Sequence, residues 1–289
     1  MEKTKEKNSQ FRQTLRVFFG RGVIAKISFC IVVIFILVAI FAPYLTPYEP
    51  EKQELLDKLQ GPSAAHLLGT DNLGRDLLTR ILYGARISLI SSVLSSLIAA
   101  ALGTLLGLIA GFFGGFLSQV IMRVVDAKMS IPPLVLTMVL AMVFGGGVAG
   151  VSIVIGISMF SSYTRVSYGM VLSLRENDYV TAAMLVGQSK AKILFKHLLP
   201  NCFPSLIVMF TMNLGSAIMM EASLSYLGIG ITPPTPAWGS MVSEGYKYLL
   251  TNPMVSIIPG LCVLLVVVSF NILGDGLRDA IDPRLRGKL

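Results

Sequence analysis

The segment from Glu176 to Asn201, ENDYVTAAMLVGQSKAKILFKHLLPN, is the densest polar stretch in the second half of the sequence, and it lies between long apolar runs. Asn177 or Asp178 can cap a first short helix by accepting hydrogen bonds from its free N–H groups. The residues expected to share one face of this helix are Tyr179, Ala182, Ala183 and Val186. Gly187 suits the left-handed position that ends such a helix, so the first helix is predicted to stop there.

A second short helix is expected to follow at once. Ser189 can cap it, and helical spacing then relates Ile193, Leu194, His197 and Leu198. Pro200 has no N–H to donate and disfavours helix at the residue before it, so this helix is predicted to stop at the proline. Two polar helices of this kind form a compact loop outside the hydrocarbon of a membrane. One interpretation is an amphipathic loop that rests on lipid headgroups.

The composition around this loop is that of an integral membrane protein. The chain of 289 residues is 54% hydrophobic and only 14% charged, whereas soluble domains have about 25% charged residues. A helical span needs about 20 apolar residues. Stretches without Asp, Glu, Lys or Arg lie between residues 26 and 49, 86 and 123, 128 and 165, 196 and 221, and 247 and 275. We therefore predict an all-α fold with six transmembrane helices, near 27–45, 88–113, 117–144, 149–172, 203–227 and 253–273.

The predicted organisation follows from these spans. Its parts are an N-terminal tail (1–26), a first transmembrane helix (27–45), a loop with an interfacial helix (46–86), a five-helix core (87–275) that includes the loop 176–201, and a C-terminal tail (276–289). The two tails and the loop carry 15 Lys and Arg against 6 in the intervening outward segments. The positive-inside rule then predicts that both termini are cytoplasmic. The first apolar run is longer than the core of a signal peptide, so it is read as a retained span.

The polar segment before the second span carries a dense motif. Its residues are Thr70, Asp71, Gly74, Arg75, Asp76, Arg80, Gly84 and Arg86. We expect its four central charges, Asp71, Arg75, Asp76 and Arg80, to pair with one another and fold the loop. Direct contact with a transported substrate is the alternative reading.

Three charges near the ends of spans are candidates for a transport path or gate: Asp126, Arg165 and Glu221. Charges at membrane depth mark functional sites by default. Asp126 can also pair with Arg123, three residues earlier on a helix, and Arg165 can anchor to headgroups.

Two further patterns concern helix packing. Glycines recur every four residues at Gly103, Gly107 and Gly111, which predicts a face for close helix contact. The prolines at 132 and 133 must kink or break the third span.

Several functions are excluded or weakened by what the sequence lacks. It contains no G-x-x-x-x-G-K-[ST] phosphate loop, so any ATP must be bound by a partner. Its two histidines, His66 and His197, are far apart, and no metal site or catalytic residue is predicted. The net charge of +8 is explained by the excess of Lys and Arg in cytoplasmic segments, so no nucleic-acid partner is expected. A proton-coupled carrier would need several carboxylates in the middle of the membrane. The candidate carboxylates here lie near the ends of their spans, so this function is weakened but stays an alternative.

The order Ala182-Ala183, Gly187, Ile193 and Leu199-Pro200 resembles the "EAA" loop of ABC-importer permeases, a coupling helix that docks in a groove of the ATPase subunit. That family has Glu before the two alanines, where this chain has Thr181. The motif before span two, and the stretches 221–242 and 271–286, are similar to C-type permeases of the dipeptide, oligopeptide and nickel branch. The resemblance assigns coupling to Tyr179, Thr181, Ala182, Ala183, Gly187, Ile193, Leu199 and Pro200.

The resemblance implies a type I ABC importer permease in a bacterial or archaeal plasma membrane. Its expected partners are a homologous B-type permease, two ATP-binding subunits and an extracytoplasmic substrate-binding protein, in a lipid bilayer. ATP and Mg would be bound by the partner subunits and no cofactor by this chain. The expected cargo is a di- or oligopeptide, with nickel or a metal–metallophore complex as the alternative. The rival classes are an ATP-independent carrier and a membrane scaffold without transport.

Overall fold

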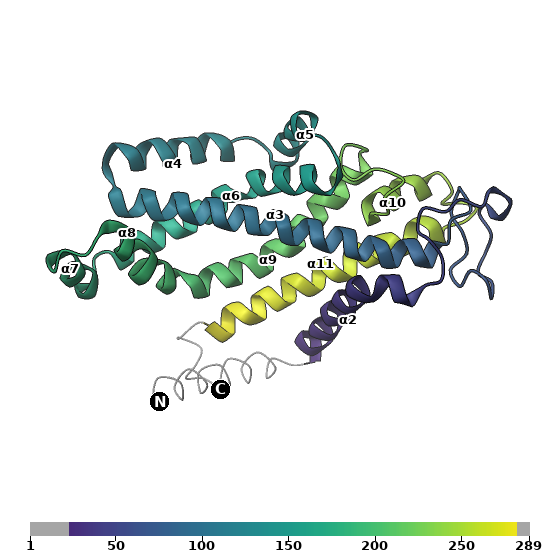
Figure 1. Cartoon of the computed structure of the whole chain (residues 1–289), viewed down its shortest axis with the longest axis horizontal. Helices are drawn as coiled ribbons and strands as arrows, with labels where there is room; N and C mark the ends of the chain where they lie inside the picture. Colours follow the sequence, from purple (N-terminus) through teal and green to yellow (C-terminus); the bar gives the residue numbers. More distant parts are fainter. Residues whose placement is uncertain (1–22, 282–289) are drawn as a thin grey trace.

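A computed structural model describes residues 23–281, which form a long helical bundle (Figure 1). Most of the predicted N-terminal tail and the end of the C-terminal tail, 1–22 and 282–289, lie outside the described residues. The elements are α2 (Val23–Leu45), η1 (Leu55–Asp57), α3 (Leu77–Phe113), α4 (Gly115–Met129), α5 (Pro133–Phe144), α6 (Gly147–Leu174), α7 (Asp178–Leu185), α8 (Lys190–Lys192), the π-helical turn η2 (Ile193–Leu198), α9 (Leu199–Tyr226), α10 (Trp238–Tyr246) and α11 (Met254–Ile281).

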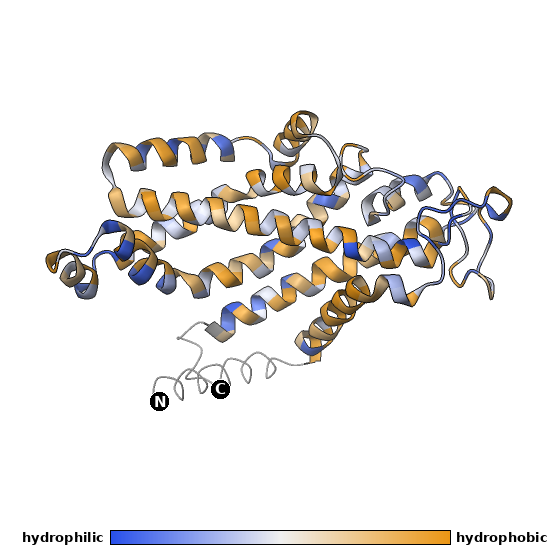
Figure 2. Cartoon of the chain, in the orientation of Figure 1, coloured by the Kyte–Doolittle hydropathy of each residue, from blue (hydrophilic) through white to orange (hydrophobic). Residues whose placement is uncertain are grey.

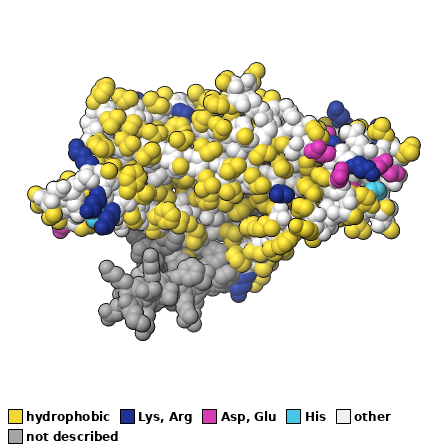
Figure 3. Space-filling view, viewed as in Figure 1, with side chains coloured by type: hydrophobic (Ala, Val, Ile, Leu, Met, Phe, Trp, Pro, Cys, Tyr) yellow, Lys and Arg dark blue, Asp and Glu magenta, His cyan; other side chains and the backbone are white. Residues whose placement is uncertain are grey.

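The long helices have the length and composition of membrane spans. Within residues 23–281 five qualify, namely α2, α3, α6, the run Lys190–Tyr226 and α11, and a sixth results if the bent pair of α4 and α5 is counted as one span. Apolar residues cover the middle of the bundle, and polar residues gather at its two ends (Figure 2). We call these ends the α7 end and the α10 end. Lys and Arg collect at the α7 end, whereas acids and bases mix at the α10 end (Figure 3).

The predicted interfacial helix and second span form one helix, α3. With 37 residues, α3 is about 56 Å long, well beyond the hydrocarbon thickness of about 30 Å. The helix leads into the second span as expected, but its placement at the membrane interface was wrong, because the apolar face of its first turns is buried inside the protein. Leu77, Ile81 and Ala85 belong to the core that includes Trp238 of α10, so they do not rest on headgroups.

The glycine stripe on α3 is a helix-packing face, as predicted. A Cβ on Gly107 would lie 2.6 Å from both Thr164 O and Ser167 Cβ of α6, and one on Gly103 would lie 2.2 Å from Phe160 O. Only glycine lets the two backbones approach this closely. Helices α3 and α6 are therefore in close backbone contact along the glycine stripe.

The third span is broken, as its prolines predict. Helices α4 and α5 meet at an angle of 99° across residues 130–132, and Pro133 stands in the first turn of α5, where its missing N–H is harmless. Figure 1 shows α4 lying along α3, while α5 is seen almost end-on at the edge of the bundle. Most side chains of α5 are apolar and exposed, and only Thr137 and Ala141 are buried.

The predicted helix stop at Pro200 was wrong. The helix continues from Lys190 to Tyr226, because its turn before the proline is a wider π turn. In this turn the Leu199 N–H donates to Leu194 O, five residues back. Pro200 therefore lies in the first turn of the α-helical part, α9, where the absence of a backbone N–H is tolerated. The loop 176–201 is thus joined without a break to the membrane-spanning α9.

The α10 end is closed by residues 46–76 and by the segment 228–253, which contains α10. Trp238 anchors this cap, since its side chain is fully buried and its Nε1 donates to Ile81 O of α3 (3.1 Å). Phe35 of α2 packs edge-on against the indole, with ring centroids 5.5 Å apart. Gly84 is required beside it, because a Cβ there would lie 2.9 Å from Trp238 Cδ1.

Candidate functional site

The loop 176–201 has the two-helix form that its sequence predicts. Gly187 takes the left-handed conformation (φ +79°), and two turn bonds close the end of α7: Gln188 N–H to Ala183 O (3.1 Å) and Gly187 N–H to Met184 O (3.0 Å). This is the Schellman arrangement that favours glycine. The Ser189 hydroxyl accepts from Lys192 N–H (3.3 Å) and caps the second helix, as predicted.

The predicted cap of the first helix was wrong in its chemistry. Asn177 stands at the cap position, but no side-chain cap bond forms. Its amide Nδ2 instead donates back to Leu174 O (3.0 Å) at the end of α6. A side chain that donates to the preceding helix ties α7 to α6 and leaves the first N–H groups of α7 without a side-chain acceptor.

Of the four residues expected to share one face of α7, only Ala183 is buried. Val180 and Ala183 are buried, together with Ile193, Leu194 and Leu198 of η2, in a core shared with α3 and α6. The Tyr179, Ala182 and Val186 side chains are exposed, as is Thr181. Beyond them the tip of the loop presents further exposed apolar side chains, Met184 and Leu185. The loop therefore has a firmly packed base and an apolar outer surface.

Polar contacts hold the two helices of the loop together. His197 Nε2 lies 2.9 Å from Gln188 Oε1. The Asn201 amide donates to His197 O (2.6 Å) and to the Tyr179 hydroxyl (3.4 Å). These bonds join the two helices of the loop to the start of α9. Leu199 is half-buried and Pro200 is exposed at this junction.

At the α10 end the motif before α3 forms a buried charge cluster. Arg75 Nε donates to Asp71 Oδ2 (2.6 Å), and Arg80 Nε lies 3.3 Å from the same oxygen. Both guanidinium groups also face Glu244 of α10, at 3.1 Å from Arg75 and 3.5 Å from Arg80. Two arginines and two carboxylates thus neutralise one another and clamp residues 71–80 to α10. This confirms the structural reading of Asp71, Arg75 and Arg80.

Asp76 was wrongly expected to join this pairing. Its carboxylate caps α3, accepting from Thr79 N–H (2.7 Å), and it also accepts from His66 Nδ1 (2.9 Å). Thr70 faces Asp76 in an isolated β-bridge and accepts from Gln60 N–H (2.9 Å). These contacts explain why the motif is dense in polar residues, since each one closes the loop or starts the helix.

The remaining motif residues stand apart from the cluster. Gly74 has φ +74° and passes so close to Glu54 that any side chain would collide with the Glu54 backbone. Gly84 admits Trp238, and Arg86 is exposed on the surface of α3. At the rim of the loop Glu54 Oε1 lies 2.9 Å from Lys52 Nζ, and the hydrogen bond to Glu54 raises the pKa of Lys52.

Of the three membrane charges, the structure brings Asp126 and Arg165 together and leaves Glu221 apart. Asp126 of α4 pairs with Arg165 of α6 at 2.6 Å, so the expected alternative pairing with Arg123 is not the one formed. Both side chains of this pair are about half exposed. Glu221 of α9 is fully buried, accepts from the Ser225 hydroxyl (2.7 Å), and its Oε2 has no partner among the described residues. Ser225 in turn accepts from Ile231 N–H (2.9 Å), so Glu221 braces the turn after α9.

A groove of about 480 Å³ lies between α5, α9 and α11. Its walls combine small, flexible and polar residues, namely Pro133, Leu134, Gly215, Ser216, Met219, Met220, Ser223, Val267 and Asn271. Within residues 23–281, no group of three or more His, Cys, Asp or Glu side chains has the geometry to hold a metal ion. The polar groups of the groove are hydroxyls and one amide, which suit hydrogen bonding.

Comparison with known proteins agrees with this geometry. Residues 103–287 match the family described as binding-protein-dependent transport system inner membrane component. The chain belongs to this family. Residues 9–62 also match the N-terminal TM domain of oligopeptide transport permease C. The protein is therefore a multi-pass membrane permease, the subunit of an ABC importer that lies in the membrane.

The permease has close relatives over almost its whole length. It is 41% identical over 285 residues to the glutathione transport system permease protein GsiD of Salmonella typhimurium (strain LT2), covering 97% of this chain and 94% of the relative. The GsiD protein of Escherichia coli O6:K15:H31 is 41% identical over 270 residues, or 93% and 89% of the two chains. An inward-facing structure of the MetNI methionine ABC transporter shares the fold, with TM-score 0.56, 18% identity, and coverage of 71% of this chain and 98% of that one.

The sequence of the permease did not reveal Glu244 as part of the charge cluster. The four charges near residues 71–80 balance by themselves, so no missing partner was apparent. One signal was present: Glu244 is the only acid between residues 222 and 274. Because Lys247 stands three residues later, a local ion pair would also account for this lone carboxylate, so the signal alone does not identify a distant partner.

Proposed function

We propose that this permease forms one half of the translocation path of an ATP-driven importer for di- and oligopeptides. Two findings support a peptide cargo: the relatives are named for transport of glutathione, which is a tripeptide, and the N-terminal match is named for oligopeptide transport. The cluster at the α10 end and the groove hold no metal-ligand set within the described residues, so nothing in them favours nickel over a peptide.

The observation that carries the coupling role is the shape of the loop 176–201. Apolar side chains at its tip, among them Tyr179, Met184 and Leu185, are exposed although its base is packed and hydrogen-bonded. An exposed apolar surface on a rigid support marks a protein contact. The partner that fits is an ATP-binding subunit with an apolar groove, which would hold ATP and Mg itself.

The loop is continuous with α9, so its movement is transmitted to the membrane region. When ATP closes the two ATP-binding subunits, the loop moves with the subunit that holds it and tilts α9 against the closely packed α3–α6 pair. The groove between α5, α9 and α11 then opens to one side or the other, as alternating access requires. Asp126 and Arg165 pair at the edge of the moving parts, and Glu221 keeps the turn after α9 in place.

The proposed assembly contains this chain, a homologous B-type permease, two ATP-binding subunits and a substrate-binding protein. Lys and Arg gather at the α7 end (Figure 3), which favours its placement in the cytoplasm together with both termini. The binding protein then docks at the α10 end, on residues 46–76 and 228–253. The charge cluster around Glu244 holds these two segments in one surface.

The test is uptake by the purified assembly in liposomes, with binding protein outside and ATP inside. We expect accumulation of a labelled tripeptide that requires both ATP and the binding protein. The matched control carries an ATP-binding subunit without hydrolytic activity. Accumulation without ATP would contradict the importer function, and ATP-dependent uptake of a nickel chelate but of no peptide would contradict the cargo.

A further inference from the structure

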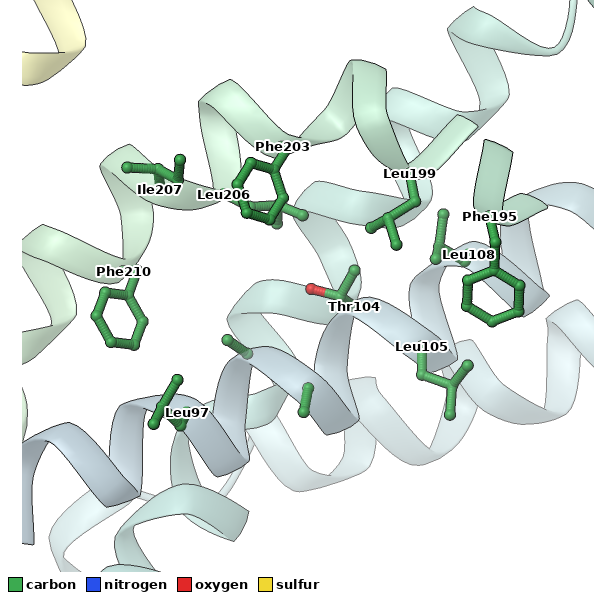
Figure 4. Close-up of a pocket in the computed structure, with 12 residues that line it drawn as sticks. Leu97, Thr104, Leu105, Leu108, Phe195, Leu199, Phe203, Leu206, Ile207 and Phe210 are labelled. Atoms are coloured by element: carbon green, nitrogen blue, oxygen red, sulfur yellow. The ribbon is translucent and has the colours of Figure 1, made fainter. Parts of the chain in front are cut away.

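A second groove, separate from the proposed path, opens on the opposite side of α9. It lies between α3 and the η2–α9 helix and has a volume of about 620 Å³ (Figure 4). Thr104 is the only polar side chain in its lining. Leu97 and Leu105 on α3 face Phe195, Phe203 and Phe210 on the other helix, and small alanines on α3 leave the space between them. Several of these side chains are exposed, so the groove opens at the apolar surface of the bundle.

The length of the groove distinguishes between two kinds of occupant. Its α3 wall runs from Leu97 to Leu108, roughly 16 Å of helix, and its other wall from Phe195 to Phe210, roughly 22 Å. Both walls are shorter than the hydrocarbon thickness of roughly 30 Å. A transmembrane helix of a partner would need a groove through both leaflets, whereas one lipid chain needs only one. The groove lies toward the α7 end, since α3 ends at Phe113 and Phe195 belongs to the loop region.

Basic side chains surround the mouth of this groove. Lys190 Nζ lies 5.3 Å from the ring centroid of Phe113, one turn beyond the groove on α3. Lys192 is three residues before Phe195 and Lys196 three before Leu199, so both lie beside lining residues on the helix. All three lysines are exposed, and no ion pair with them is found in the described part of the chain. The loop thus offers positive charge at the mouth of the groove that no ion pair in the described part of the chain neutralises.

We propose that the groove holds an acyl chain of an anionic phospholipid from the leaflet at the α7 end, with its phosphate at Lys192 and Lys196. The apolar walls of the groove contact the acyl chain, and the two lysines bind the negatively charged phosphate. Each lysine near a membrane surface strengthens binding of an anionic lipid by about fivefold. A bound lipid would fill the gap between α3 and α9 at the root of the loop that moves in transport.

Native mass spectrometry of the purified importer assembly tests this proposal. The probes are phosphatidylglycerol and phosphatidylcholine with identical acyl chains, offered together in nanodiscs. We expect the wild-type permease to retain phosphatidylglycerol in preference, and the variant Lys192→Gln/Lys196→Gln to lose this preference by roughly 25-fold. Both lysines are exposed, so this variant should fold.

A second pair of variants tests the groove itself. Ala101→Trp fills the groove from its open side and should abolish retention of both lipids. Leu102→Trp places the same indole one residue away, outside the lining, and should retain them. A photoreactive residue at Ala101 should crosslink to lipid. Equal retention of both lipids by the wild type, or crosslinking of Ala101 mainly to a helix of another subunit, would overturn the proposal. Uptake of peptide is measured separately, so loss of lipid is distinguishable from loss of transport.

Discussion

Glu244→Gln is expected to destabilise the permease by about 3 kcal/mol, because it leaves two buried arginines facing one carboxylate. At an effective dielectric constant near 20, charges 3.1 Å apart attract by roughly 5 kcal/mol. Removal of one member of a buried pair costs about 3–5 kcal/mol in total. Glu244 itself is 21% exposed, so water partly solvates it and the lower end of this range applies.

The single tryptophan provides the assay. Trp238 is fully buried on α10, the helix that carries Glu244, and its fluorescence reports unfolding of the α10 end. The free energy of unfolding is measured by SDS titration of the full chain in bicelles. Glu54→Gln is the matched control, since Glu54 pairs with Lys52 at an exposed site where such a pair contributes less than about 1 kcal/mol.

A double variant separates the charge effect from loss of packing. Glu244→Gln/Arg75→Gln leaves Asp71 and Arg80 as a neutral pair, so its loss of stability should be smaller than the sum of the single losses by about 1–2 kcal/mol. The reasoning is refuted if Glu244→Gln unfolds no more easily than Glu54→Gln, or if the two single effects simply add.

Three further predictions concern the loop, the helix packing and the exposed ion pair. Gly187→Val should abolish ATP-dependent uptake, because valine resists φ +79°, whereas Gly187→Asn should transport; normal uptake by the valine variant would contradict this. Gly107→Ala should cost about 1–3 kcal/mol in unfolding free energy, while Gly169→Ala, with open space around it, should be neutral or slightly stabilising; equal effects would refute close packing. Asp126→Asn should change stability by less than about 1 kcal/mol, since Asp126 and Arg165 are about half exposed, and a larger loss in the same titration would show a buried role.

The parts of the structure that sequence predicts well are those fixed by local chemistry. Gly187 predicts a turn because glycine readily adopts the left-handed conformation. Ser189 predicts a helix cap because its hydroxyl can accept a hydrogen bond from a backbone N–H. The glycine stripe from Gly103 to Gly111 predicts a close helix contact, because a small residue every fourth position has little other use in a membrane helix. Spans follow from the absence of charge over long stretches.

The parts that escaped prediction depend on distant neighbours or on a turn geometry that the sequence does not announce. Asp126 has a base three residues away, yet it pairs with Arg165 because α6 lies against α4. Pro200 reads as a helix stop, but the preceding π turn accommodates it. Glu244 joins Arg75 across 169 residues of sequence. Neither of the two ion pairs has a local pattern, and the π turn has no known sequence signal, so only the folded arrangement reveals them.

Crosslinking from the loop tests the central proposal, that this loop is the contact with the ATP-binding subunits. Cys30, Cys202 and Cys262 are first replaced by serine in the assembled importer. A single cysteine is then placed at Leu185, an exposed leucine at the tip of the loop, or at Leu250, an equally apolar and exposed leucine at the opposite end. We expect Leu185→Cys to crosslink to an ATP-binding subunit in an ATP-dependent manner, and Leu250→Cys not to do so. Absence of crosslinks from Leu185, or equal crosslinking of the two positions, would contradict the proposal.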